Sequence, residues 1–101
     1  MNPQLISIVI PCKNEAENIP PLLDEIAEHM GDREIEVVIV NDGSTDNTAA
    51  VLEEEAGKRA FPVRHIHHAS SVGQSLSLRS GVLAAGGEVV ATIDGDGQND
   101  P

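Results

Sequence analysis

The sequence has 101 residues, of which 40% are hydrophobic and 23% charged, so it predicts one small globular domain and excludes a disordered chain. The formal net charge of −11 argues against nucleic acid and anionic lipid headgroups as partners, and it is compatible with a site for a divalent cation. With one cysteine, no signal peptide and no apolar run long enough to span a bilayer, the expected location is cytoplasmic.

The first 40 residues predict a strand, a helix and a second strand. An apolar run over residues 5–10 predicts a buried strand that stops at Pro11. A helix is expected to begin after Asn18, which can cap it, and to end at Gly31. A second apolar run over 36–40 predicts another buried strand. The inward face of the helix is expected to consist of Leu22, Leu23, Ile26, Ala27 and Met30.

The middle of the chain repeats this alternation. Ser44 or Thr45 can cap a helix over about 46–58, and a weaker strand is predicted over 62–67. The residues of this helix that are expected to face inward are Ala50, Val51 and Leu52.

A third helix, rich in small residues, is expected over about 73–85, and a fourth strand over 88–93. Gly81 lowers helix propensity, so it predicts close packing of this helix against the sheet. Strands that alternate with helices predict right-handed βαβ units. We therefore expect residues 1–101 to form one α/β unit, a Rossmann-like parallel sheet with helices on both faces.

Ligands of such folds bind beyond the carboxyl ends of the strands, near the point where the strand order reverses. Short polar segments follow the predicted strands and are the candidate site. They are residues 11–15, 41–46, 68–74 and 94–100.

The last segment carries two carboxylates two residues apart, Asp94 and Asp96, in a glycine-rich loop. Such a pair can bind one hard ion, Mg²⁺ or Mn²⁺, and Gln98 can add an amide oxygen. For an isolated pair of this kind, a solvated acidic turn is the commoner explanation. A calcium-binding EF-hand is disfavoured because its loop requires glycine where Asn99 stands and a helix before it.

Asp42, in the second segment, could accept hydrogen bonds from a nucleobase or a ribose hydroxyl, or it could belong to a turn and helix cap. The segment lacks both the G-x-G-x-x-G pattern of dinucleotide-binding folds and the P-loop pattern. In the first segment, Glu15 could bind a ligand or favour the start of the helix. Cys12 has no readable partner and is given no catalytic role.

Arg79 could pair with a phosphate or form a structural salt bridge, and the sequence favours neither. Three histidines, His65, His67 and His68, suggest a metal site, and His65 and His67 share one face of the predicted third strand. An exposed edge strand explains these histidines more simply.

Four segments in the same order and at similar spacing resemble the N-terminal part of family 2 glycosyltransferases, especially the polyprenol-phosphate sugar transferases similar to dolichyl-phosphate mannose synthase. The order and spacing match over nearly the whole chain. The matching pieces are 8–11 with 14–19, 36–46, Gly73 with 79–81, and 94–101.

The resemblance implies a GT-A fold in which the strands run third, second, first, fourth. It implies that Asp94, Asp96 and Gln98 hold Mg²⁺ or Mn²⁺ on the diphosphate of a nucleotide sugar, with Asp96 as the catalytic carboxylate and Asp94 also touching the nucleotide. The residues implied to line the nucleoside pocket are Pro11, Lys13, Glu15, Val40 and Asp42, with Asp42 reading the base.

The implied reaction transfers the sugar to a polyprenyl phosphate at the cytoplasmic face of a membrane. Cys12 and Lys13 stand where family members often have Thr-Tyr, and Asn41 replaces a frequent Asp. Family domains are about twice this length, so we expect residues 1–101 to be a truncated part that is inactive alone. An uncovered fourth strand would favour a homodimer or larger assembly. The alternatives are a saccharide acceptor, or an inactive nucleotide-binding or assembly module.

Overall fold

The computed structural model of the protein describes residues 5–14, 16–43, 47–87 and 89–93. Strands and helices alternate along the chain, as the sequence predicts. The elements are β1 (Ile6–Cys12), α1 (Ile19–Met30), β2 (Ile35–Asp42), α2 (Thr48–Ala56), β3 (Val63–His68), α3 (Gln74–Ala84) and β4 (Val89–Thr92). All strand pairs are parallel and the order is β3-β2-β1-β4, which confirms both the fold class and the implied strand order.

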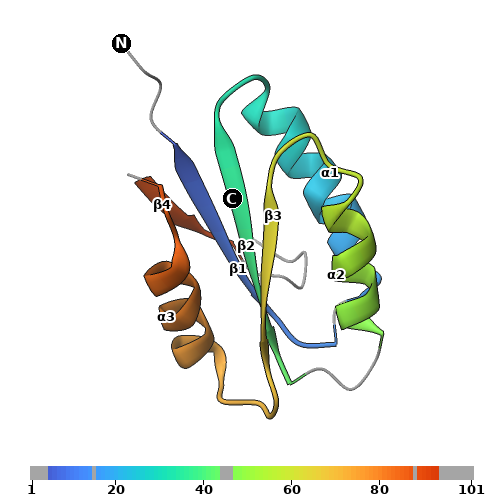
Figure 1. Cartoon of the computed structure of the whole chain (residues 1–101), viewed down its shortest axis with the longest axis vertical. Coiled ribbons are helices and arrows are strands. Elements are labelled where there is room, and N and C mark those ends of the chain that lie inside the picture. Colours follow the sequence, from blue (N-terminus) through green and yellow to red (C-terminus); the bar gives the residue numbers. More distant parts are fainter. Residues whose placement is uncertain (1–4, 15, 44–46, 88, 94–101) are drawn as a thin grey trace.

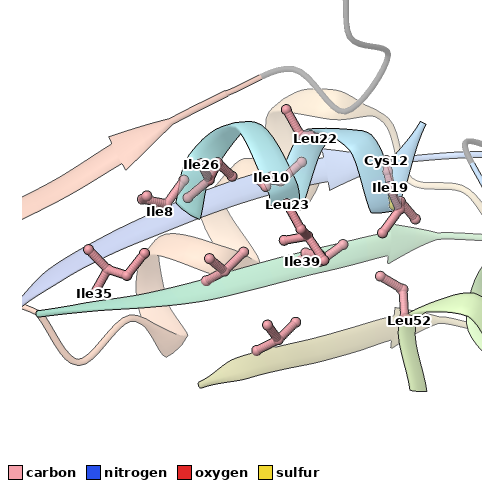
Figure 2. Packing of buried hydrophobic residues seen from close by; sticks show 12 residues of the cluster. Ile8, Ile10, Cys12, Ile19, Leu22, Leu23, Ile26, Ile35, Ile39 and Leu52 are labelled. Atoms are coloured by element: carbon pink, nitrogen blue, oxygen red, sulfur yellow. The ribbon is translucent and has the colours of Figure 1, made fainter. Parts of the chain in front are cut away.

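Helices cover both faces of this sheet. Figure 1 shows α3 on one side and α1 with α2 on the other. Alternate residues of a strand point to opposite faces, so β1 and β2 contribute apolar side chains to both layers. Most of the buried apolar cluster lies between the sheet, α1 and α2 (Figure 2). Its members include Ile8, Ile10, Ile19, Leu22, Leu23, Ile26, Ile35, Val37, Ile39 and Leu52.

The inward face of α1 is narrower than the sequence predicts. Leu22, Leu23 and Ile26 are buried and Met30 is half-buried, but Ala27 is exposed. Ala27 follows Ile26 by one residue, a rotation of about 100° around the helix axis, which carries it to the solvent side.

The start and the inward face of α2 also differ from the prediction. The helix begins at Thr48 with Asn47 in the cap position, rather than after Ser44 or Thr45. Ala50 is exposed, because the buried face of α2 repeats every three to four residues and Ala50 falls between its members. That face consists of Thr48, Leu52 and Glu55.

Pro11 does not stop the first strand, since β1 continues to Cys12. Pro11 pairs with Val40 of β2, whereas the described pairing of β1 with β4 ends at Val9 and Thr92. Proline is tolerated where one side of a strand needs no backbone donor, so the strand can pass through Pro11.

Gly81 explains how closely α3 approaches the sheet. A Cβ atom at Gly81 would lie 2.3 Å from Cγ1 of Val9 and 3.1 Å from Cγ2 of Val40. Only a residue without a side chain fits there, so the close packing that the sequence predicts for Gly81 is confirmed.

The buried carboxylate of Glu36 fixes the connection between α3 and β4. Its Oε2 accepts hydrogen bonds from Ser7 Oγ at 2.5 Å and from the Gly86 amide at 2.7 Å, and Oε1 accepts one from Arg64 at 3.1 Å. The Gly87 amide in turn donates to Ser7 Oγ at 2.8 Å. These bonds set the point at which β4 joins the sheet.

The fourth strand is the least covered element. All four residues of β4 are exposed, although three of them, Val89, Val90 and Ala91, are apolar. Leu76 and Leu83 of α3 are exposed as well, to 52% and 75%. In the described part of the chain no helix is both long and apolar enough to cross a membrane.

Candidate functional site at the carboxyl edge of the sheet

The strand order reverses between β1 and β4. β1 pairs with β2 on one side and with β4 on the other, and the Ile93 amide donates to the Val9 carbonyl oxygen at 3.1 Å. Asp94 follows Ile93 directly in the sequence. The last described residue before the predicted metal-binding segment, Ile93, therefore lies at the edge of the sheet where open α/β folds bind their ligands.

Asp42 ends β2 at this carboxyl edge, and its side chain is almost fully buried. Its Oδ1 accepts hydrogen bonds from His68 Nδ1 and from the Val72 amide, both at 2.9 Å. Its Oδ2 accepts from Ser71 Oγ and from the Gly73 amide, also at 2.9 Å. One carboxylate thus holds the whole loop between β3 and α3.

The hydrogen bonds to Asp42 also determine its charge. Burial alone would raise the pKa of this carboxyl group, because desolvation disfavours the ionised form. Hydrogen bonds from Val72, His68, Ser71 and Gly73 favour the ionised form more strongly, and they hold the pKa of Asp42 far below its usual range. Asp42 therefore places a fixed negative charge at the edge of the sheet.

Two further contacts hold the loop between β3 and α3 against its neighbours. His68 Nε2 lies 3.2 Å from Oγ of Ser80 on α3, so His68 links Asp42 to the helix. Gly43, with φ +69°, approaches the next loop so closely that a Cβ atom there would lie 2.4 Å from the Ser71 amide nitrogen. Glycine is needed at this position for both reasons, and the turn after β2 and the loop before α3 form one packed unit.

The other predicted nucleoside contacts differ in accessibility. Lys13 is exposed beyond the end of β1, and Pro11 is buried beside its pairing partner Val40. Val40 has no exposed surface and packs beneath Gly81 of α3. The pairing brings these residues to the same edge as Asp42, and their contacts with a nucleoside stay predictions.

Four predicted site residues lie outside the described residues. They are Glu15, Asp94, Asp96 and Gln98. Their roles stay predictions from the sequence and the resemblance.

Arg79 is exposed on α3, and no ion pair joins it to a carboxylate of the described residues. The structural salt bridge therefore finds no support in this part of the chain. A contact between Arg79 and a phosphate stays a prediction.

The sequence predicts that the segment 68–74 belongs to the site and suggests His68 as a metal ligand, but it does not predict that His68 and Ser71 bind Asp42. Both contact Asp42 across more than 25 residues of sequence. His68 ends β3 directly beside Asp42 at the end of β2, and this pairing is known only from the register of the two strands.

Comparison with known proteins identifies the family. A sequence model described as glycosyl transferase family 2 matches residues 7–101. The chain belongs to glycosyl transferase family 2. This confirms the resemblance, and the parallel sheet described above is the first part of a GT-A fold.

Two curated relatives illustrate the match. A dodecaprenyl-phosphate galacturonate synthase of Rhizobium johnstonii is 34% identical over 98 residues, covering 95% of this chain and 29% of that protein. An undecaprenyl-phosphate 4-deoxy-4-formamido-L-arabinose transferase of Proteus mirabilis is 38% identical over 98 residues, covering 95% of this chain and 30% of that protein. The 101 residues thus span less than a third of the length of these family members.

A solved structure of a glycosyltransferase agrees in fold. The mannosyltransferase PcManGT from Pyrobaculum calidifontis, in complex with GDP-Man and Mn²⁺, superposes with a TM-score of 0.83 at 26% identity. The superposition covers 95% of this chain and 28% of PcManGT.

Proposed function

We propose that this chain is the donor-binding part of a glycosyltransferase that binds a nucleoside-diphosphate sugar through a divalent metal and transfers the sugar to a polyprenyl phosphate. The observation that carries the proposal is the strand register at the carboxyl edge. It brings Pro11, Asp42 and the end of β4 to the reversal of strand order, and Asp94 follows there in the sequence.

The metal is Mg²⁺ or Mn²⁺, with Asp94, Asp96 and Gln98 as its ligands. Carboxylate and amide oxygens are the donors that these hard ions prefer, so the residue types fit. The bound ion stabilises negative charge on the departing nucleoside diphosphate. The GDP-Man and Mn²⁺ bound to PcManGT support the choice of a divalent ion, and they do not select between Mg²⁺ and Mn²⁺ for this chain.

The described residues position the donor rather than react with it. The loop that ends at Gly73 and the turn at Gly43 form a fixed wall at the site. Asp42 accepts hydrogen bonds from the loop, and the turn follows Asp42 directly and packs against the loop. Lys13 is exposed at the same edge and brings a positive charge close to the position proposed for the nucleotide. Fixed groups cost little to order when the donor binds.

The polyprenyl phosphate acceptor is proposed because both relatives carry such a lipid phosphate in their names. In a protein as long as these relatives, the reaction would take place at the cytoplasmic face of a membrane. Since the chain spans under a third of the relatives, we expect the 101 residues to bind the donor and to transfer no sugar on their own.

The acceptor is tested with a protein that contains this chain within a domain as long as its relatives. Labelled nucleotide sugars are incubated with undecaprenyl phosphate or with oligosaccharides, and the products are separated by extraction into organic solvent. Label in the lipid phase is expected. Label only in a saccharide would favour the second candidate, a family member with a saccharide acceptor, and label in neither would favour an inactive binding module.

We also propose that the chain forms a homodimer or a larger assembly through β4. The support is the exposure of all four β4 residues, whose strand pairs with β1 alone among the described residues. An open apolar edge favours pairing with another strand, and a two-fold axis closes such pairing in the simplest way.

A further inference from the structure

Two histidines on β3 lie together on one face of the sheet. His65 pairs with Ile39 and His67 pairs with Asn41, which places both on the side that carries α1 and α2. His65 Nδ1 lies 2.7 Å from His67 Nε2, and the ring centroids are 4.8 Å apart. Two imidazole nitrogens therefore converge on one point of the surface.

That separation is close to what a shared metal ion requires. Zinc binds imidazole nitrogen at about 2.0–2.1 Å, which places two nitrogens of one tetrahedral ion about 3.3–3.4 Å apart. A small rotation of the two side chains would widen the distance between the nitrogens enough for both to bind one ion. Both rings are reachable from solvent, since His65 is half-buried and His67 is exposed.

Asn41 completes the arrangement behind His67. Its side-chain Nδ2 lies 3.1 Å from His67 Nδ1, so in this amide orientation the nitrogen faces the ring. Histidines that bind a metal through one nitrogen usually donate the other N–H to an acceptor, which fixes the ring. Rotation of the Asn41 amide by half a turn presents its oxygen to Nδ1–H, while Nε2 of the same ring faces His65.

We propose that His65 and His67 form a binding site for a transition-metal ion of the Zn²⁺ type, separate from the predicted Mg²⁺ or Mn²⁺ site. Imidazole suits Zn²⁺, Ni²⁺ and Cu²⁺, whereas the hard ions prefer oxygen. Among the described residues no group of three or more His, Cys, Asp or Glu side chains is placed to hold a metal. The protein supplies two ligands, and water fills the other positions.

The charge of the protein favours the binding of a cation. The net charge of −11 raises the local concentration of cations around the whole molecule.

The test is calorimetric titration of tag-free protein with ZnCl₂ at pH 7.5, in excess Mg²⁺ to occupy the oxygen-ligand site. One equivalent of Zn²⁺ is expected to bind. His65→Gln and His67→Gln should each weaken it by at least about tenfold, because each removes the second arm of a chelate. His29→Gln is the matched control, since His29 is exposed on α1 and contacts only the Glu25 carbonyl oxygen among the described groups.

The NMR signals of the histidine imidazoles test the Zn²⁺ site independently in the unsubstituted protein. Zn²⁺ should shift the signals of two of the four histidines, and the His65→Gln and His67→Gln spectra assign them. The proposal is overturned if Zn²⁺ fails to bind, if affinity survives in either variant, if His29→Gln weakens it equally, or if the two shifted signals belong to other histidines.

Discussion

At the scale of single residues, Asp42 is the most constrained side chain of the carboxyl edge. A carboxylate offers about four lone-pair positions, and four donors, one at the end of β3 and three in the loop before α3, fill them. A nucleobase that bonded to Asp42 would have to replace or share one of these donors. The proposed role of Asp42 in reading the base is thus coupled to the position of this loop.

Replacing Asp42 by Asn tests this anchoring. One acceptor oxygen becomes an NH₂ group that faces donors, so we expect the free energy of unfolding to fall by about 1–3 kcal/mol. Urea unfolding measures the change, and hydrogen exchange at the Val72 and Gly73 amides should show that the loop has opened. Asp32→Asn makes the same change of charge at an exposed site and should leave both quantities unchanged. A variant as stable and as protected as the parent would show that the four bonds contribute nothing.

The lowered pKa of Asp42 also predicts how acid affects stability. A group whose pKa is lower in the folded state stabilises the fold above its unfolded pKa of about 3.9, and this contribution is lost as the pH falls. The difference in unfolding free energy between the parent and Asp42→Asn should therefore be full at pH 6 and shrink steadily below about pH 4. Unfolding curves from pH 6 to pH 2.5 measure it, and a difference that did not vary with pH would contradict the assigned ionisation.

How well the sequence predicts the contacts of a residue depends on how far apart in the sequence the two contacting residues lie. The sequence predicts a role for Asp42 because a carboxylate at a strand end is visible in the sequence alone. It does not predict the contacts of His68 and Ser71 with Asp42, since the register that joins β2 to β3 appears only in the folded chain. Ala27 and Ala50 were misplaced because alanine is compatible with both faces of a helix.

At the scale of elements, the packing of α3 on the sheet depends on Gly81. The sequence located every strand and helix to within a few residues, because apolar runs alternate with amphipathic ones. The strand through Pro11 and the start of α2 were missed, since both are set by neighbours in space. The contact of Gly81 with Val9 and Val40 is one that the sequence did anticipate.

Gly81→Ala should destabilise the fold although alanine is the better helix former. The gain in helix propensity is about 1 kcal/mol, and the clash of the new methyl group with Val9 and Val40 should exceed it, for a net loss of about 1–2 kcal/mol. Thermal and urea unfolding measure the loss. Gly57→Ala, where the new Cβ would meet only the Glu54 carbonyl oxygen at 3.6 Å, is the control and should change stability little.

A second substitution locates the cause of this loss. When Val9→Ala is added to Gly81→Ala, the loss of stability should be smaller than the sum of the two single losses, because Val9→Ala removes the atom that the new methyl group would meet at 2.3 Å. Additive losses in the double variant would show that the two sites do not interact and that the close approach has another cause.

At the scale of the whole molecule, β4 differs from the other strands because the described residues leave it exposed. Strands of parallel sheets are normally buried on both faces, whereas every residue of β4 is exposed. The relatives are more than three times as long as this chain, so in them further residues are available to cover such a strand.

Self-association through β4 should appear in light scattering over a range of protein concentrations. We expect a dimeric or larger mass, because Val89 and Val90 are exposed on a strand that pairs on one side only among the described residues. Val90→Lys should shift the mass toward the monomer, whereas Ala49→Lys, at an exposed site on α2, should leave it unchanged. A monomer at every concentration would exclude the proposed assembly.

The central claim is that this chain binds a nucleoside diphosphate through a divalent metal at the carboxyl edge of the sheet. Calorimetric titration with GDP and with UDP, in Mn²⁺, in Mg²⁺ and in EDTA, tests it most directly. We expect binding of at least one nucleotide in the presence of metal, its loss in EDTA and in Asp96→Asn, and its retention in the charge-matched Asp32→Asn. Equal affinity with and without metal, or normal binding by Asp96→Asn, would contradict the metal site, and binding of neither nucleotide under any condition would contradict the claim itself.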